Sequence, residues 1–184
     1  MFKKFNAAED VSSFNQAKSS VVRAIRAKLV EQYPPIEEYI DDIVPKKEAV
    51  HMIKCREHVE LVAIKNEVMF FHDQRDENYI PTLRLLHKYP TILPRVQVDK
   101  GAIKFVLSGA NIMCPGLTSP GGKMDTPLPE NTVVAVMAEG KEHALSIGVT
   151  KMSTQDIATV NKGIAIDSIH FLRDGLWVMK EAHT

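Results

Sequence analysis

The chain has 184 residues and a formal net charge of zero, from 23 basic and 23 acidic side chains. Its apolar share of 45% is ordinary for a globular protein with a buried core, and the length allows one ordinary domain or two small ones. Residues 1–94 carry 14 basic and 14 acidic side chains, and residues 95–184 carry nine of each. This balance excludes nucleic-acid binding through a global positive field and leaves only a local patch.

The cysteine count and the hydropathy predict a soluble protein of the cytoplasm. Cys55 and Cys114 are the only cysteines and lie far apart in strand-like surroundings, which indicates free thiols in a reducing compartment. No apolar run is long enough to cross a membrane. The first ten residues, MFKKFNAAED, lack the apolar segment of a secretory signal.

The first third of the chain predicts two helices separated by a proline pair. Ser12 or Ser13 can cap a long helix that ends near Tyr33. Its buried stripe would consist of Phe14, Val21, Ile25 and Leu29. After Pro34-Pro35, a shorter helix is expected to run to Pro45 with Ile36, Ile40, Ile43 and Val44 facing inward. Its acidic residues lie on the opposite, solvated side, so we expect no metal site and no cofactor there.

A strand-rich region follows. Apolar and β-branched runs predict strands at residues 50–55, 59–64 and 68–71, with a hairpin turn at 65–67. Pro81 is placed to open a helix of sequence TLRLLHKY. The stiff segment from Pro90 to Pro94 then marks a domain boundary, which gives an N-terminal domain over 1–92 and a C-terminal domain over 93–184.

The second half predicts a small, largely closed β-barrel. Strands are expected at residues 96–98, 132–138, 143–152, 164–172 and 176–178. Ser153, with Asp156 three residues later, indicates a helix start between two of them. The expected fold class is α+β, with an N-terminal α/β domain packed against a C-terminal barrel.

In one stretch, Asp99 to Gly116, the sequence pattern predicts the local structure most clearly. Asp99 can cap a short helix whose apolar face consists of Ala102, Ile103, Val106 and Leu107. Lys100 and Lys104 lie four residues apart and share another face. Gly109 can take the left-handed conformation that ends a helix, and Pro115-Gly116 is expected to turn the chain after a short extended segment. The stretch contains no nucleophile, general base or metal cluster.

This stretch closely resembles the core of a PUA domain, an RNA-binding module found beside pseudouridine synthases and archaeosine transglycosylases. The pattern D-x-G-A-x-x-x-V-x-x-G-A-x-x-x-x-P-G is present as Asp99, Gly101, Ala102, Val106, Gly109, Ala110, Pro115 and Gly116. The start MFKKF, the corner Pro45-Lys46-Lys47 and the segments 81–88 and 98–120 extend the match. Together they resemble the malignant T-cell-amplified sequence protein family over nearly the whole chain.

The resemblance implies a translation factor that is not an enzyme. Family members form a heterodimer with density-regulated protein, and the pair binds the small ribosomal subunit. It promotes reinitiation, releases tRNA during recycling and supports non-standard initiation, so the implied partners are density-regulated protein, small-subunit rRNA and tRNA, with no membrane. Two alternatives stay open: an RNA-modification enzyme that carries a PUA domain, and an adaptor whose PUA surface binds only protein.

The RNA-binding residues that we expect lie mainly in the same stretch. Lys100 and Lys104 can neutralise phosphates, although like charges four residues apart on a helix cost about 0.2–0.5 kcal/mol. The small residues Gly109 and Ala110, followed by Asn111, would let RNA approach the backbone N–H groups. Arg84 and Lys88, near the domain junction in sequence, can extend the patch.

Overall fold

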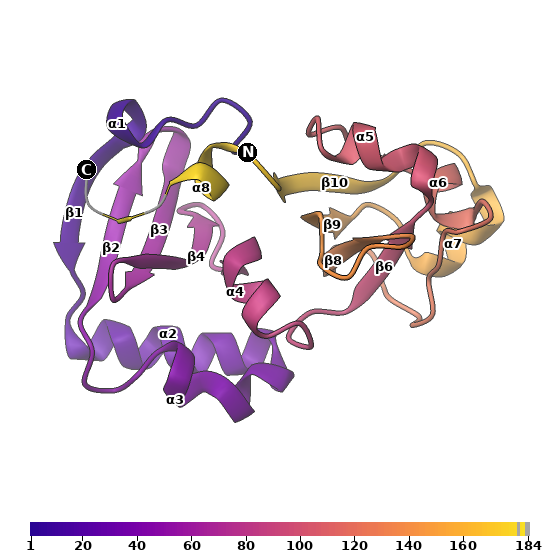
Figure 1. The fold of residues 1–184 in the computed structure, drawn as a ribbon. Coiled ribbons are helices and arrows are strands. Elements are labelled where there is room, and N and C mark those ends of the chain that lie inside the picture. Colours follow the sequence, from indigo (N-terminus) through magenta and orange to yellow (C-terminus); the bar gives the residue numbers. More distant parts are fainter. Residues whose placement is uncertain (180, 183–184) are drawn as a thin grey trace.

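A computed structural model describes residues 1–179 and 181–182 of the protein. Two five-stranded sheets lie side by side, the first in the order β1-β2-β3-β4-β5 and the second in the order β6-β8-β9-β10-β7 (Figure 1). The first sheet consists of β1 (Val11–Gln16), β2 (Val50–Cys55), β3 (Val59–Ile64), β4 (Glu67–Asp73) and β5 (Ile80–Pro81). The second consists of β6 (Arg95–Val98), β7 (Ile112–Met113), β8 (Val133–Ala138), β9 (Ser146–Thr150) and β10 (Ile164–Phe171). Mixed helices and sheets in two units confirm the expected α+β class.

The helices are mostly short. The α-helices are α1 (Ala7–Asp10), α2 (Ser19–Gln32), α3 (Ile40–Ile43), α4 (Leu83–Lys88), α5 (Ile103–Val106), α6 (Cys114–Thr118), α7 (Thr154–Val160) and α8 (Gly175–Val178). Three 3₁₀ helices complete them: η1 (Pro34–Tyr39), η2 (Arg56–His58) and η3 (Lys100–Ala102). No helix in residues 1–179 and 181–182 combines the length and apolar character that crossing a bilayer requires.

Both faces of the first sheet are covered. Ile25 and Leu29 of α2, and the expected inward residues of η1 and α3, pack with Val62 and Phe70 on one face. On the other face, Phe2 packs with Ile53, Leu61 and Phe71. Burial on both faces explains why β3 is nearly all apolar rather than alternating.

The predicted start of the first helix, at Ser12 or Ser13, is wrong. Residues Val11–Gln16 form β1, an edge strand antiparallel to β2, and α2 begins only at Ser19. Phe14 therefore stacks on His51 of β2, at 4.6 Å between ring centroids, instead of joining a helical stripe with Ile25. Val21 is 41% exposed. Pairing with β2 outweighs the weak helical preference of this segment.

The expected helix at Pro81 starts slightly later. Pro81 ends β5, and the side chain of Thr82 caps α4 by accepting a hydrogen bond from the Leu85 N–H at 3.3 Å. The strands expected at 50–55, 59–64 and 68–71 are confirmed. So is the turn between β3 and β4, where Lys65 and Asn66 both have positive φ.

The second sheet is curled into a half-barrel. β6 runs parallel to β8, whereas the other pairs are antiparallel. Its core contains Val98, Val106, Ile112, Val134 and Ile166. The expected cap of α7 is confirmed, since Ser153 Oγ accepts the Asp156 N–H at 3.1 Å. Cys114 is buried in this unit and Cys55 in the first, and both are free, as expected.

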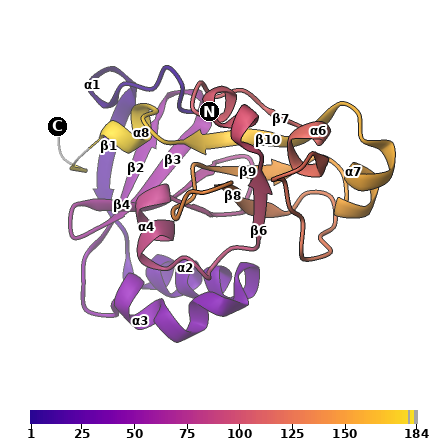
Figure 2. The ribbon, with the colours of Figure 1, turned by 45° about the vertical axis from the view of Figure 1, so that its right-hand side comes forward.

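The chain returns to the first sheet after β10. The strand expected at 176–178 is instead α8, because Asp174 caps it by accepting the Trp177 N–H at 2.9 Å. Figure 2 shows β10 pointing toward α8, which lies against the first sheet. Leu176 and Ala182 complete the apolar layer around Phe2. The unit after residue 92 thus contributes residues to the core of the unit before it.

Candidate nucleic-acid interface

The Asp99–Gly116 stretch forms a continuous series of short elements, η3, α5, β7 and α6. Asp99 is the N-cap as expected, with Oδ1 accepting the Ala102 N–H at 2.9 Å. Val106 is fully buried, while Ala102, Ile103 and Leu107 pack against the core of the second sheet. The stretch expected to turn at Pro115-Gly116 forms α6, because proline suits the first turn of a helix.

Gly109 ends α5 in the left-handed conformation, with φ of +84°. A Cβ at this position would lie 2.7 Å from the ring of Phe171, so glycine is needed for space as well as for φ. Its N–H donates to the Val106 carbonyl at 3.0 Å, and the Ala110 N–H donates to the Phe105 carbonyl at 3.1 Å. These two N–H groups therefore have partners at the helix end, and the contact of RNA with Gly109 and Ala110 stays a prediction.

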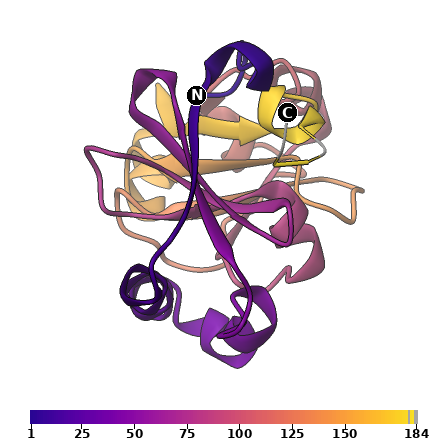
Figure 3. The same ribbon diagram turned by 90° about the vertical axis from the view of Figure 1, so that its left-hand side faces the viewer.

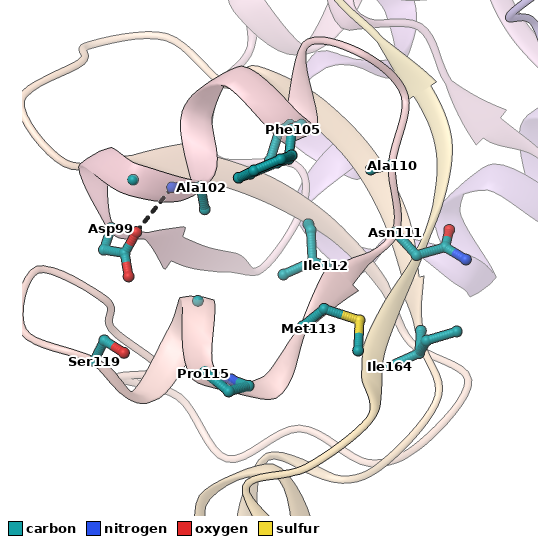
Figure 4. A pocket seen from close by; sticks show the side chains of 13 residues that line it. Asp99, Ala102, Phe105, Ala110, Asn111, Ile112, Met113, Pro115, Ser119 and Ile164 are labelled. Atoms are coloured by element: carbon teal, nitrogen blue, oxygen red, sulfur yellow. Dashed lines mark hydrogen bonds between the residues drawn. The ribbon is translucent and has the colours of Figure 1, made fainter.

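An apolar groove lies between η3–α5 on one side and β7–α6 on the other. Its volume is about 640 Å³, and Figure 4 shows its side chains. Three large hydrophobic side chains at the groove are exposed, Phe105 by 56%, Met113 by 49% and Ile164 by 41%. Clustered exposure of this kind is typical of a binding surface. Because the lining is mainly apolar, it suits a ring or an apolar side chain better than a phosphate.

The other side of η3 and α5 carries positive charge. Lys100 and Lys104 line a second hollow together with Lys141 and Glu139. The Glu139 carboxylate accepts the backbone N–H of Lys100 at 3.3 Å. Lys104 Nζ lies 5.0 Å from the ring centroid of Phe105. We call the surface of Lys100, Lys104 and Lys141 the lysine face; it presents three cations against one carboxylate.

The expected RNA-binding residues do not form one patch. Ala110 and Asn111 line the apolar groove, and the Asn111 Oδ1 accepts the Ser168 N–H at 2.9 Å. Arg84 and Lys88 belong to α4, beside the first sheet, whereas α5 lies on the far side of the second (Figure 1). Arg84 donates to the Trp177 carbonyl at 2.7 Å, and Lys88 pairs with Glu67 at 2.9 Å. The structure brings together only Lys100 and Lys104 on the lysine face.

Sequence reasoning missed Phe105, Met113, Ile164 and Lys141. Phe105 gave a signal, because it falls outside the apolar face of Ala102 and Val106 and is thus an aromatic ring on the polar side of a helix. No sequence signal pointed to Lys141, since its place beside Lys100 and Lys104 depends on the turn between β8 and β9. Among the described residues, no group of three or more His, Cys, Asp or Glu side chains is arranged to hold a metal ion.

Two family models match the chain. A Pre-PUA-like domain matches residues 5–90, and a PUA domain matches residues 94–172. Among solved structures, a hypothetical protein of Pyrococcus horikoshii is 25% identical with a TM-score of 0.72, over 90% of this chain and 98% of that one. A PUA-domain protein of Aeropyrum pernix, 21% identical over 92% of each chain, has the same fold with a TM-score of 0.69.

Named relatives are much more similar. Malignant T-cell-amplified sequence 1-B of Xenopus laevis is 59% identical over 180 residues, covering 98% of both chains. Malignant T-cell-amplified sequence 2 of Homo sapiens is also 59% identical with the same coverage. Identity of this level over nearly the whole length, with both domains matched, shows that the chain belongs to the malignant T-cell-amplified sequence family.

Proposed function

We propose that the protein is a non-catalytic translation factor that binds the small ribosomal subunit together with density-regulated protein in the cytoplasm. In that role it promotes reinitiation, tRNA release in recycling and non-standard initiation. The PUA domain supports RNA binding, and the near full-length relatives support a translation-related role. The observation that carries the proposal is that one short helical segment has a lysine face on one side and an apolar groove on the other.

The lysine face contacts the RNA backbone. Lys100 and Lys104 make no ion pair in the described part of the chain, so their charges are available to phosphates. Placing two like charges one turn apart is unfavourable for the isolated helix, and a bound phosphate removes that penalty. Because the chain has no net charge, such contacts set where it binds rather than adding a general attraction.

The apolar groove accepts side chains of density-regulated protein. Exposed aromatic and methionine side chains around a concave apolar centre are typical of protein interfaces. Phe105 and Met113 provide that chemistry at the mouth of the groove. A partner seated there leaves the lysine face open, so RNA and protein can bind the same segment together.

Filter binding to purified small ribosomal subunits across a salt series tests the RNA contact. The variant Lys100→Gln/Lys104→Gln removes two phosphate contacts and should reduce the slope of log K against log salt by about 1.4–1.8. The matched control, Lys3→Gln/Lys54→Gln, removes two exposed cations from the N-terminal unit.

An unchanged slope in a folded Lys100→Gln/Lys104→Gln variant would contradict the role of the lysine face. The alternatives are separated in the same samples. Turnover in a tRNA-modification assay would favour an enzyme, and no RNA crosslink with density-regulated protein present would favour a protein-only adaptor.

A further inference from the structure

A second concave surface with positive charge lies at the other end of the molecule. It is a hollow of about 530 Å³ between the end of β1, the first turns of α2 and the segment from Lys46 to Val50. Figure 3 looks at this end of the molecule, with α2 seen nearly end-on. The apolar groove and the lysine face belong to η3 and α5 on the second sheet, away from this end (Figure 1).

The hollow departs from the neutral charge of the domain that carries it. Arg23, Arg26, Lys46 and Lys47 line it, against the single carboxylate of Glu48. Glu48 is engaged by Lys65, at 3.6 Å between the charged atoms. The one acid in the lining therefore does little to neutralise its four cations.

Arg26 holds the hollow in shape. Its Nη1 donates to the carbonyls of Ile40 and Val44, and its Nη2 pairs with Asp41. These bonds fasten the end of α3 to the side of α2, so the corner that follows is fixed. The Ala17 N–H donates to the Val50 carbonyl at 2.8 Å and fixes the opposite wall.

Three of the four cations in the lining have no ion-pair partner in the described part of the chain. Arg23, Lys46 and Lys47 are exposed, and none forms an ion pair among the described residues. Arg26 and Glu48, by contrast, have partners. Arg23, Lys46 and Lys47 thus line one concavity, where the only carboxylate of the lining, Glu48, is paired with Lys65.

We propose that Arg23, Lys46 and Lys47 form a second site for phosphate groups of an RNA backbone, which we call the corner site. The inference rests on the proposed RNA-binding function and extends it to the N-terminal unit. A protein partner would need apolar or aromatic anchors, which dominate interface energies. The lining of the corner site contains cations and small apolar side chains but no aromatic anchor, and cations are sufficient for backbone binding.

Two separated sites also explain how a neutral protein can hold a large RNA. Each site alone makes two or three phosphate contacts, which gives weak binding. Joined through one folded chain, the second contact becomes intramolecular and its effective concentration rises. The corner site and the lysine face would then contact two separate segments of the same ribosomal RNA.

The test compares full-length Arg23→Gln/Lys46→Gln/Lys47→Gln with Lys3→Gln/Lys54→Gln/Arg56→Gln, which removes the same charge from exposed positions outside the hollow. Both are titrated with purified small subunits over a salt series. The corner-site variant should reduce the slope of log K against log salt by about 2.1–2.7. A second variant, Lys46→Gln/Lys47→Gln, should give about 1.4–1.8. Thermal unfolding midpoints verify that all variants are folded.

Each outcome decides the assignment. Equal slopes in the corner-site variant and its control would overturn it. A normal RNA slope with weaker binding to density-regulated protein would also overturn it, because the surface would then serve a protein. A reduced slope here with a normal slope in Lys100→Gln/Lys104→Gln would support the corner site and reject only the lysine face. A wild-type chain that binds neither subunits nor RNA would refute both.

Discussion

The guanidinium of Arg84 lies over the ring of Trp177, with 4.3 Å between Cζ and the ring centroid, and its Nη2 also donates to the Trp177 carbonyl. Arg84 belongs to α4 in the first unit, and Trp177 belongs to α8 after the second sheet. The pair therefore fastens the returning C-terminal segment to the N-terminal unit. Arg84 therefore has a structural role, unlike the cations that face solvent.

Replacing Arg84 should destabilise the fold without changing RNA binding. Arg84→Ala loses a cation–π contact of about 0.5–2 kcal/mol and a hydrogen bond of about 0.5–1.5 kcal/mol, so we expect a loss of roughly 1–3.5 kcal/mol in the free energy of unfolding measured with urea. Arg84→Lys keeps the charge but not the planar contact and should recover only part of the loss. If Arg84→Ala instead lowers the salt slope of subunit binding by about 0.7–0.9, Arg84 contacts a phosphate.

Gly109→Ala should be costly for two separate reasons. The residue has positive φ, and an added Cβ would overlap the Phe171 ring. We expect a loss of about 2–4 kcal/mol in the free energy of unfolding, with overpacking contributing about 1–3 kcal/mol. Gly163→Ala is the matched control, because Gly163 has φ of +85° and nothing within 4 Å of its added Cβ. Equal losses in the two variants would show that Phe171 moves aside freely.

The stability of the domain junction should depend on pH through His87. Burial there lowers the pKa of the imidazole below 6.5, only partly offset by its hydrogen bond to the Ala144 carbonyl. The unfolded chain therefore binds a proton more readily than the folded chain. The contribution of His87 to the free energy of unfolding should be complete above pH 7. It should decrease as the pH falls through 6.5 toward the lower pKa that His87 has in the folded protein.

Urea unfolding between pH 5 and 8 measures this effect. His87→Gln should flatten the dependence relative to wild type, since glutamine does not titrate. His58→Gln, at an exposed histidine, controls for the histidine-to-glutamine exchange itself. A His87→Gln profile that parallels wild type would assign the pH dependence to other groups.

The apolar groove should be needed for the partner and not for RNA. Phe105→Ala/Met113→Ala removes two exposed side chains, so we expect little change in stability but a loss of affinity for density-regulated protein of about 30-fold or more. Isothermal titration with the purified partner measures the loss. Val160→Ala, at another exposed apolar residue outside the groove, should bind normally. Unimpaired partner binding by the double variant would place the interface elsewhere.

Much of the fold could be predicted because local signals agree with the tertiary structure. The caps at Asp99 and Ser153, the buried residues Ile36, Ile40 and Ile43, and the strands of the first sheet all follow their patterns. The two errors have different causes. Residues 11–16 become a strand because β2, far along the chain, is available to pair with them. Residues 175–178 become a helix because of a local signal that was missed, the cap that Asp174 provides directly before them.

The candidate site was predicted only in part, for the same reason. Lys100 and Lys104 could be placed on one face from their spacing alone. The lack of space for a side chain at Gly109 could not, because it depends on Phe171, which lies 62 positions later in the chain. The exposed ring of Phe105 could have been noticed from its place outside the apolar face. The contribution of Ile164 to the groove depends on the antiparallel pairing of β10 with β7.

The apolar layer that joins the two sheets has a consequence for distances. Ala135, Ala144 and Ile147 of the second unit share a core with Leu85 and Ile92, and Leu176 seals the opposite face. Separating the units would expose these side chains, so we expect one unfolding transition and no hinge between them. We therefore expect the separation of Lys46 and Lys104 to stay constant, so that the two proposed phosphate sites would contact RNA segments at a fixed distance from each other.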